Sequence, residues 1–290
     1  MFRFMILALI LIFSFHTFGT PVEPECGISD HPHTPSGHRI IDGVLVEKGE
    51  LPWIIFVKYS NATVKDHPLC SGSIIAKNYV LFARHCFRGE GATYHVRAGV
   101  VDKRDTSAVI INTTIVHLPP NDGGRNDIAI LELPEPFTFN ENIRPMCLKK
   151  NFDETSYKDL ALISGFGAKK WFPRCRHEPC PPHPEAYDGK LRKGTSLFVA
   201  PYDCEDYYEN LDPEVDICEQ GQNGTEIFKG DSGSPIVIKN PPRPDGKVQW
   251  TQVGVCSRGH GAVGIPKIFT RVSHNCEWIA DVTKNAAKCS

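Results

Sequence analysis

The chain is dominated by short runs of β-branched and aromatic residues that turn-forming residues interrupt at close spacing. From Ile40 onward, runs such as 53–57 (WIIFV), 109–111 (VII) and 235–238 (PIVI) are separated by Gly, Pro, Asn and Asp. Runs of this length and composition are typical of strands in an all-β barrel or sandwich. Only residues 275–287 have helical character. The sequence therefore predicts an all-β fold with one C-terminal helix.

The start of the chain and its cysteine content indicate an exported protein. Residues 1–19 run from Met-Phe-Arg through an apolar stretch to small residues near a cut, which is the pattern of a cleaved secretory signal peptide. An uncleaved anchor is the competing interpretation, but it needs a longer apolar stretch, and no other run approaches the ~18 residues of a membrane span. Eleven cysteines in an exported chain predict a secreted, extracellular protein with a disulfide framework.

The remaining composition narrows the class of partner. With 290 residues, 41% of them hydrophobic, the chain can bury one large core or two moderate ones. The net charge of −2 argues against a nucleic-acid partner, because phosphates usually require a basic patch. Three Asn-x-Ser/Thr sequences, at Asn61, Asn112 and Asn223, are compatible with a glycoprotein.

Three short motifs carry residues that can together attack an acyl carbon. The stretch GDSGSP puts Ser232 on a glycine-bracketed tight turn, ARHC supplies His85, and NDIAIL supplies Asp127. A serine hydroxyl alone is a poor nucleophile and needs a base and a group that orients the base. Taken singly, the three residues have other interpretations: a packed barrel histidine, a turn-capping aspartate and a turn serine. Taken together, they favour a catalytic triad.

In the order His, Asp, Ser, these motifs resemble the trypsin/chymotrypsin-like serine protease family. The resemblance runs from about Cys26 to the C-terminus. It implies two antiparallel six-stranded barrels with the active site in the cleft between them, and a C-terminal α-helix. We expect a protease domain over residues 40–290, with the first barrel at about 40–150 and the second at about 155–275.

The resemblance also implies a role for each residue of the motifs. Ser232 would be the nucleophile, His85 would take its proton and return it to the leaving amine, and Asp127 would hold the imidazole in the right tautomer. The backbone N–H groups of Gly230 and Ser232 would form the oxyanion hole, and a side chain at Gly230 would disturb it. Ser257 matches the position where the family places a hydroxyl behind the aspartate.

Activation by cleavage is a further implication of the resemblance. Residues 20–39 would be a propeptide, and Arg39-Ile40 resembles the zymogen site that a trypsin-like protease cuts. The freed ammonium of Ile40 would turn inward and pair with Asp231, which would order the oxyanion loop. Because a buried charge without a partner is costly, the Ile40 ammonium and the Asp231 carboxylate should become buried as a pair.

The cysteines give an independent test of the alignment with the family. The resemblance implies three disulfides: Cys26 with Cys147, Cys70 with Cys86, and Cys204 with Cys218. The spacing of Cys175 and Cys180 favours a small disulfide over half of a metal site, and Cys276 and Cys289 are placed to clasp the C-terminal helix. Cys256 is left over in an apolar setting, which predicts a buried, inert thiol.

The predicted substrate pocket departs from the family pattern. Its floor is expected at Glu226, where an acid would favour cleavage after Lys or Arg, but Lys267 stands where the family usually keeps a glycine and could neutralise Glu226. Arg258 stands where the family favours tryptophan, and Arg84 precedes the histidine where alanine is usual. The residues expected to form the substrate pocket are Glu226, Ser257, Arg258, Gly259 and Lys267.

Two functions remain open at this point. The first is a secreted serine endopeptidase, made as a zymogen, that works through an acyl-enzyme without cofactor or metal. The second is a catalytically weak or inactive protease-like module that binds or regulates a partner. The intact triad favours the first and the altered pocket favours the second. Expected partners are a polypeptide substrate, an activating trypsin-like protease and, as a candidate, a protein inhibitor, but neither nucleic acid nor membrane.

Overall fold

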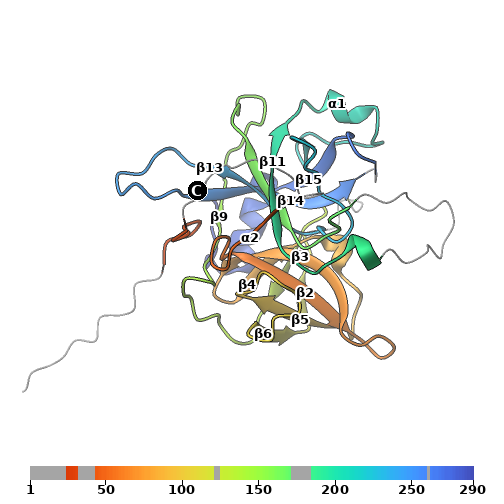
Figure 1. Cartoon of the computed structure of the whole chain (residues 1–290), viewed down its shortest axis with the longest axis vertical. Helices are drawn as coiled ribbons and strands as arrows, with labels where there is room; N and C mark the ends of the chain where they lie inside the picture. Colours follow the sequence, from red (N-terminus) through yellow and green to blue (C-terminus); the bar gives the residue numbers. More distant parts are fainter. Residues whose placement is uncertain (1–23, 32–42, 121–124, 171–183, 260–261) are drawn as a thin grey trace, which may run out of the picture.

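A computed structural model describes most of the chain, as two β-barrels with a short C-terminal helix (Figure 1). The described residues are 24–31, 43–120, 125–170, 184–259 and 262–290. Three features that the sequence predicts lie outside them: the signal peptide, the cleavage site at Arg39-Ile40, and the pair Cys175 and Cys180. No helix within the described residues is long and apolar enough to cross a membrane.

The first barrel, orange to yellow-green in Figure 1, is an antiparallel sheet in the order β6-β5-β2-β3-β4-β8-β7. Since only Thr114 separates β6 from β7, these two act as one interrupted strand and close six strands into a barrel. The strands are β2 (Ile54–Ser60), β3 (His67–Ala76), β4 (Tyr79–Phe82), β5 (Thr93–Ala98), β6 (Val109–Thr113), β7 (Ile115–His117) and β8 (Ala129–Glu132).

The second barrel, green to blue in Figure 1, closes through a pairing of β11 with β12. Its six strands follow the order β11-β10-β13-β14-β15-β12. They are β10 (Ala161–Gly165), β11 (Arg192–Phe198), β12 (Asp216–Gly221), β13 (Pro235–Lys239), β14 (Trp250–Gly259) and β15 (Lys267–Arg271). The predicted all-β fold with two antiparallel barrels is therefore confirmed.

Two short strands tie the first half of the chain to the second barrel. β1 (Val44–Leu45) pairs with β11, and β9 (Cys147–Leu148) pairs in parallel with β14. A buried apolar cluster that includes Trp53, Phe56, Phe166 and Trp250 fills the space where the two halves meet. The rings of Phe56 and Phe166 lie 5.6 Å apart, centre to centre. Burial of such large side chains holds the barrels in a fixed relation.

The helices are few and short. α1 covers Tyr202–Glu205 and α2 covers Cys276–Val282, while 3-10 turns occupy Arg84–Cys86, Pro184–Ala186 and Ser273–Asn275. The helical character of residues 275–287 predicted a longer helix than α2. The helix ends early because Lys284 and Asn285 take positive φ angles, which a right-handed helix cannot contain.

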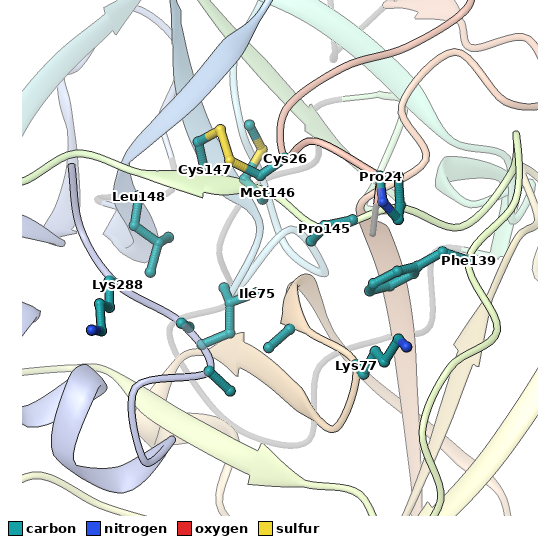
Figure 2. Close-up of a pocket in the computed structure, with 13 residues that line it drawn as sticks. Pro24, Cys26, Ile75, Lys77, Phe139, Pro145, Met146, Cys147, Leu148 and Lys288 are labelled. Carbon is teal, nitrogen blue, oxygen red and sulfur yellow. A yellow bond between two sulfur atoms is a disulfide. The ribbon is translucent and has the colours of Figure 1, made fainter. Parts of the chain in front are cut away.

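Four disulfides join described cysteines, in pairs that the sequence analysis expected: Cys26–Cys147, Cys70–Cys86, Cys204–Cys218 and Cys276–Cys289. Cys256 is free and buried. Figure 2 shows the Cys26–Cys147 bond at one side of a cavity of about 380 Å³, with Phe139, Lys77 and Lys288 around it. Residues 24–31 are thereby tethered to the barrels at the start of β9.

A buried ion pair fastens the end of β15 to the segment that precedes β10. Nη1 and Nη2 of Arg271 donate to the two carboxylate oxygens of Glu154 at 2.8 and 2.5 Å. The same guanidinium donates to the carbonyls of Phe152, Pro213 and Asp216. Arg271 is 7% exposed and Glu154 8%, so neither charge is solvated. The charge of each residue is therefore compensated by the charge of the other.

Replacing the arginine of this pair should destabilise the fold strongly. Arg271→Met leaves the Glu154 carboxylate buried without a counterion, so we expect a loss of about 3–5 kcal/mol in the free energy of unfolding, measured by urea denaturation. Arg243→Met removes two surface ion pairs, with Glu25 and Asp245, and should cost less than about 1 kcal/mol. A loss for Arg271→Met no larger than that of the control would contradict the prediction.

Candidate active site

The predicted catalytic histidine lies on a short turn that buried neighbours hold in place. Strand β4 is buried along its whole length, and the 3-10 turn that follows carries His85 outward, while Cys86 points inward and bonds to Cys70 of β3. His85 Nδ1 lies 2.7 Å from Asp127 Oδ2, and the backbone N–H of His85 donates to Asp127 Oδ1 at 2.8 Å. An ionised carboxylate can only accept, so Nδ1 carries the proton and Nε2 is left as the acceptor.

The Asp127 carboxylate is the centre of the site's hydrogen bonds. The hydroxyl of Ser257, on β14, donates to Asp127 Oδ2 at 2.6 Å. Burial alone raises the pKa of Asp127, but the hydrogen bonds from His85 and Ser257 outweigh it and hold this pKa below its usual value. Asp127 is therefore ionised at neutral pH, as a group that orients an imidazole must be.

A pair of amides places the Asp127 segment, and motif analysis did not find it. Asn126 and Asn275 exchange two hydrogen bonds, of 2.6 and 3.0 Å, through their side-chain amides. Both residues are buried, and Asn275 ends the 3-10 turn before α2. The residue before Asp127 is thus fastened to the C-terminal segment. Their distance in sequence gave no signal for this contact.

The turn that carries Ser232 lies between the two barrels. The carbonyl of Ser232 accepts from the backbone N–H of Ser71 in the first barrel at 2.9 Å, and Gly233 N–H donates to the carbonyl of Cys256 in the second at 2.8 Å. Gly233 has a φ of 82°, and a Cβ there would overlap the carbonyl of Ser71 and press on Ala83. The serine turn therefore packs directly against the backbone that leads to His85.

The residues before Ser232 form the buried side of the same turn. Gly230 has a φ of 98°, which suits glycine alone among common residues. Asp231 is fully buried, and its carboxylate accepts from the backbone N–H groups of Gly167 at 2.7 Å and Phe228 at 2.8 Å. Burial raises the pKa of Asp231 to about 6. Its predicted partner, the amine of Ile40, lies outside the described residues.

The structure brings Glu226 and Lys267 together as a buried pair. Lys267 Nζ lies 3.0 Å from Glu226 Oε2 and also donates to the carbonyls of Ala262, at 3.0 Å, and Ile265. The other carboxylate oxygen of Glu226 accepts from the backbone N–H of Gly264. Glu226 and Lys267 are 5% and 2% exposed. All three ammonium hydrogens thus have acceptors, and the charge of Glu226 is offset inside the protein.

A second buried acid, which the sequence analysis missed, faces this pair. Glu219 on β12 is directly opposite Lys267 on β15 and has no exposed surface. Ser196 donates its hydroxyl hydrogen to one carboxylate oxygen of Glu219, while the other lacks a partner among the described residues. Burial raises the pKa of Glu219 to about 7, against an opposing effect of Lys267. The sequence did contain a signal, because Glu219 is an acid within a run of strand-forming residues. The residue opposite it, however, depends on strand register, which the sequence analysis did not determine.

Beside the histidine, a groove of about 670 Å³ opens between the barrels. Arg258 lines it, with Nη2 2.7 Å from the buried Asp216 Oδ2. Gly259 follows Arg258 on β14, and a Cβ there would meet the side chain of Lys267. The groove is lined by Arg84, His85, Phe87, Leu118, Asp127, Ser257 and Arg258.

The described residues contain one group with metal-ligand atoms close together, and its chemistry does not suit a metal. Ligand atoms of Cys70, His85 and Cys86 lie within 4.8 Å of one another. The two sulfur atoms are bonded to each other and cannot act as thiolates. His85 is instead engaged by Asp127.

Comparisons with known proteins agree with the fold and the motifs. The family model described as trypsin matches residues 40–279. The chain is 27% identical over 284 residues to phenoloxidase-activating factor 3 of Holotrichia diomphalia, covering 89% of this chain and 75% of that protein. It is 28% identical over 296 residues to CLIP domain-containing serine protease HP8 of Bombyx mori, covering 89% and 72%. A third relative, transmembrane protease serine 9 of Rattus norvegicus, is 26% identical over 274 residues, covering 91% and 24%.

Glu219 should make stability fall as the pH rises. Its folded-state pKa of about 7 lies above the ordinary 4.5, so the stability tied to its proton is complete below about pH 4.5 and is lost as the pH passes about 7. Glu219→Gln keeps a neutral side chain at every pH. Between pH 5 and pH 8, we therefore expect the variant to gain roughly 2–3 kcal/mol relative to the unmodified protein in urea denaturation. The exposed Glu214→Gln is the control, and equal pH profiles for both variants would refute the assignment.

Proposed function

The chain belongs to the trypsin family of serine proteases, and from this premise we propose that it is a secreted serine endopeptidase made as a zymogen. The observation that carries the proposal is the hydrogen-bond chain from Ser257 through Asp127 to His85, beside the turn of Ser232. An imidazole oriented in this way leaves Nε2 ready to accept a proton. The predicted signal peptide and the disulfides support export.

In the proposed reaction, the Ser232 hydroxyl attacks the carbonyl carbon of the scissile peptide bond, and its proton passes to His85 Nε2. The oxygen of the tetrahedral intermediate accepts hydrogen bonds from the backbone N–H groups of Gly230 and Ser232. His85 then gives its proton to the leaving amine, and the acyl group remains on Ser232. Water then attacks the acyl group with His85 as base, and the carboxylic acid product leaves Ser232.

We propose that cleavage after Arg39 activates the protein, with a trypsin-like protease as the activator. The ammonium of Ile40 would then pair with Asp231. The full burial of Asp231 and its raised pKa support this role, because a carboxylate in such a setting gains from a cation. The Cys26–Cys147 disulfide would keep the propeptide attached after cleavage.

The proposed substrate is a polypeptide that is not selected mainly by a basic residue at the cleavage point. The ammonium of Lys267 already neutralises the carboxylate of Glu226, and the aliphatic part of the lysine side chain packs against Gly259. A long basic side chain would therefore find neither room nor a free carboxylate. One relative is named as an activating factor and another as a serine protease, which fits limited proteolysis of another protein.

A second candidate function is a protease-like binding or regulatory module. The buried cluster of Glu219, Glu226 and Lys267 favours it, since these residues close the region where a substrate side chain would enter. The salt bridge of Arg258 with Asp216 also favours it. Such a protein would dock a partner in the groove without turnover.

Covalent labelling distinguishes the two functions. After limited trypsin treatment, a fluorophosphonate should label Ser232 to near one equivalent, because only an activated serine attacks this reagent. The Ser232→Ala and Arg39→Gln variants should stay unlabelled, the second because its activation site is lost. Folded protein that begins at Ile40 and remains unlabelled would support the binding module instead.

The Lys267–Glu226 pair should suppress cleavage after Lys and Arg. In activated Lys267→Gly, a peptide library should show the preference for Lys or Arg at the cleavage point rising by at least about tenfold, because Glu226 becomes available to the substrate. Lys267→Met, which frees the charge but fills the space, should gain much less. If folded Lys267→Gly protein that reacts with the fluorophosphonate shows an unchanged preference, the Lys267–Glu226 pair does not determine specificity.

A further inference from the structure

We infer that the groove beside His85 binds an acidic side chain of an extended peptide, and that Arg84 is the residue that recognises it. This inference rests on the proposed function, since it assigns a class of substrate to the same site. It concerns binding, however, and does not require that the bound peptide be cleaved. Arg84 is a specificity residue in this account and takes no part in proton transfer.

The position of Arg84 puts it next to the reacting groups. It begins the 3-10 turn on which His85 follows, and both residues line the groove of about 670 Å³. Phe87 and Leu118 supply apolar wall, while Arg84 and Arg258 supply cationic wall. A concave site with apolar walls and a few placed charges is the usual form of a ligand site. A peptide in this groove would therefore lie beside Arg84 when its reactive bond approaches His85.

Among the described residues that line the groove, Arg84 has a guanidinium charge without an acceptor. Its Nη1 atom is buried and has no hydrogen-bond partner among the described residues. A buried cationic donor without an acceptor is costly, and that cost is recovered when an acceptor arrives. A carboxylate is the best match, because it accepts two parallel hydrogen bonds from one guanidinium.

The other charges of the groove are already engaged. Arg258 is held by Asp216, which is 4% exposed, so much of its charge is offset. Asp127 is bound by His85 and Ser257. Neither of these carboxylates forms a hydrogen bond or an ion pair with Arg84. Among the described residues that line the groove, the charge without a recorded counterion is therefore positive, and it belongs to Arg84.

The backbone beside the groove suits an extended ligand. Strand β14 pairs with β13 only up to Val255, whereas its pairing with β15 continues to Gly259. Ser257 and Arg258 therefore lie on a stretch with β15 along one side. An extended peptide that adds to such a stretch is held by main-chain hydrogen bonds, and its side chains then reach the walls. This geometry favours a peptide over a small free anion.

Binding to a peptide library tests the inference without relying on turnover. The Ser232→Ala protein, cleaved after Arg39, is incubated with random hexapeptides in which each position in turn is fixed as Glu, Gln, Asp or Asn. At one position we expect the acidic peptides to bind at least about tenfold more tightly than their amides, the size of a hydrogen-bonded charge pair. The difference should shrink at high salt.

Variants of Arg84 test whether this residue causes the preference for acidic peptides. In Arg84→Gln the acid-over-amide ratio should fall to about one, and in Arg84→Lys part of it should remain because the charge is kept. Arg104→Ala, which removes an exposed arginine paired with Asp102, should leave the ratio unchanged. A preference that survives in Arg84→Gln, or no acidic preference at any position, would overturn the inference.

The same samples separate this inference from the proposed function. Fluorophosphonate labelling of the protein that keeps Ser232 reports on catalysis alone. Labelling without an acidic preference leaves the endopeptidase standing and rejects the role of Arg84. An acidic preference without labelling supports the role of Arg84 in a binding module. Inorganic phosphate, added as a competitor, should compete weakly, because it lacks a backbone to pair with β14.

Discussion

The carboxylate of Asp127 is the group on which the rest of the site depends. It joins His85 of the first barrel to Ser257 of the second through hydrogen bonds of 2.7 and 2.6 Å. A buried anion needs such donors, so the burial of Asp127 and the orientation of the imidazole support each other. The turn of Ser232 is bonded to both barrels as well, through Ser71 and Cys256. The site therefore exists only where the barrels are packed together.

The charges around this centre are distributed in an unusual way. Where a family member would have an open pocket, Glu226 and Lys267 form a buried ion pair, and the buried Glu219 lies opposite Lys267 in the sheet. In the adjacent groove, the guanidinium of Arg84 is left with a buried nitrogen that has no acceptor among the described residues. Under our proposal, recognition by charge acts in the groove rather than in the pocket. The physical reason is that a buried charge with a partner attracts a charged ligand weakly, whereas a charge without a partner attracts a ligand of opposite charge strongly.

Much of the fold could be predicted because it depends on local signals. The β-branched runs predicted strands, and two barrels were confirmed with β6 and β7 acting as one strand around Thr114. Local signals failed where long-range contacts decided the outcome. β1 and β9 pair with the second barrel although they belong to the first half of the chain. The C-terminal helix also ends earlier than predicted, at Val282, because Lys284 and Asn285 take positive φ angles.

The sequence by itself determined the family, the motifs around His85, Asp127 and Ser232, and the pairing of Glu226 with Lys267, since each was readable from residue type and position. The tertiary structure alone decided that Glu219 faces Lys267, that Asn126 is fastened to Asn275, and that Nη1 of Arg84 has no hydrogen-bond partner among the described residues. These contacts join residues far apart in the chain or depend on strand register. Register and barrel packing arise from the sum of many weak contacts, which no short motif encodes.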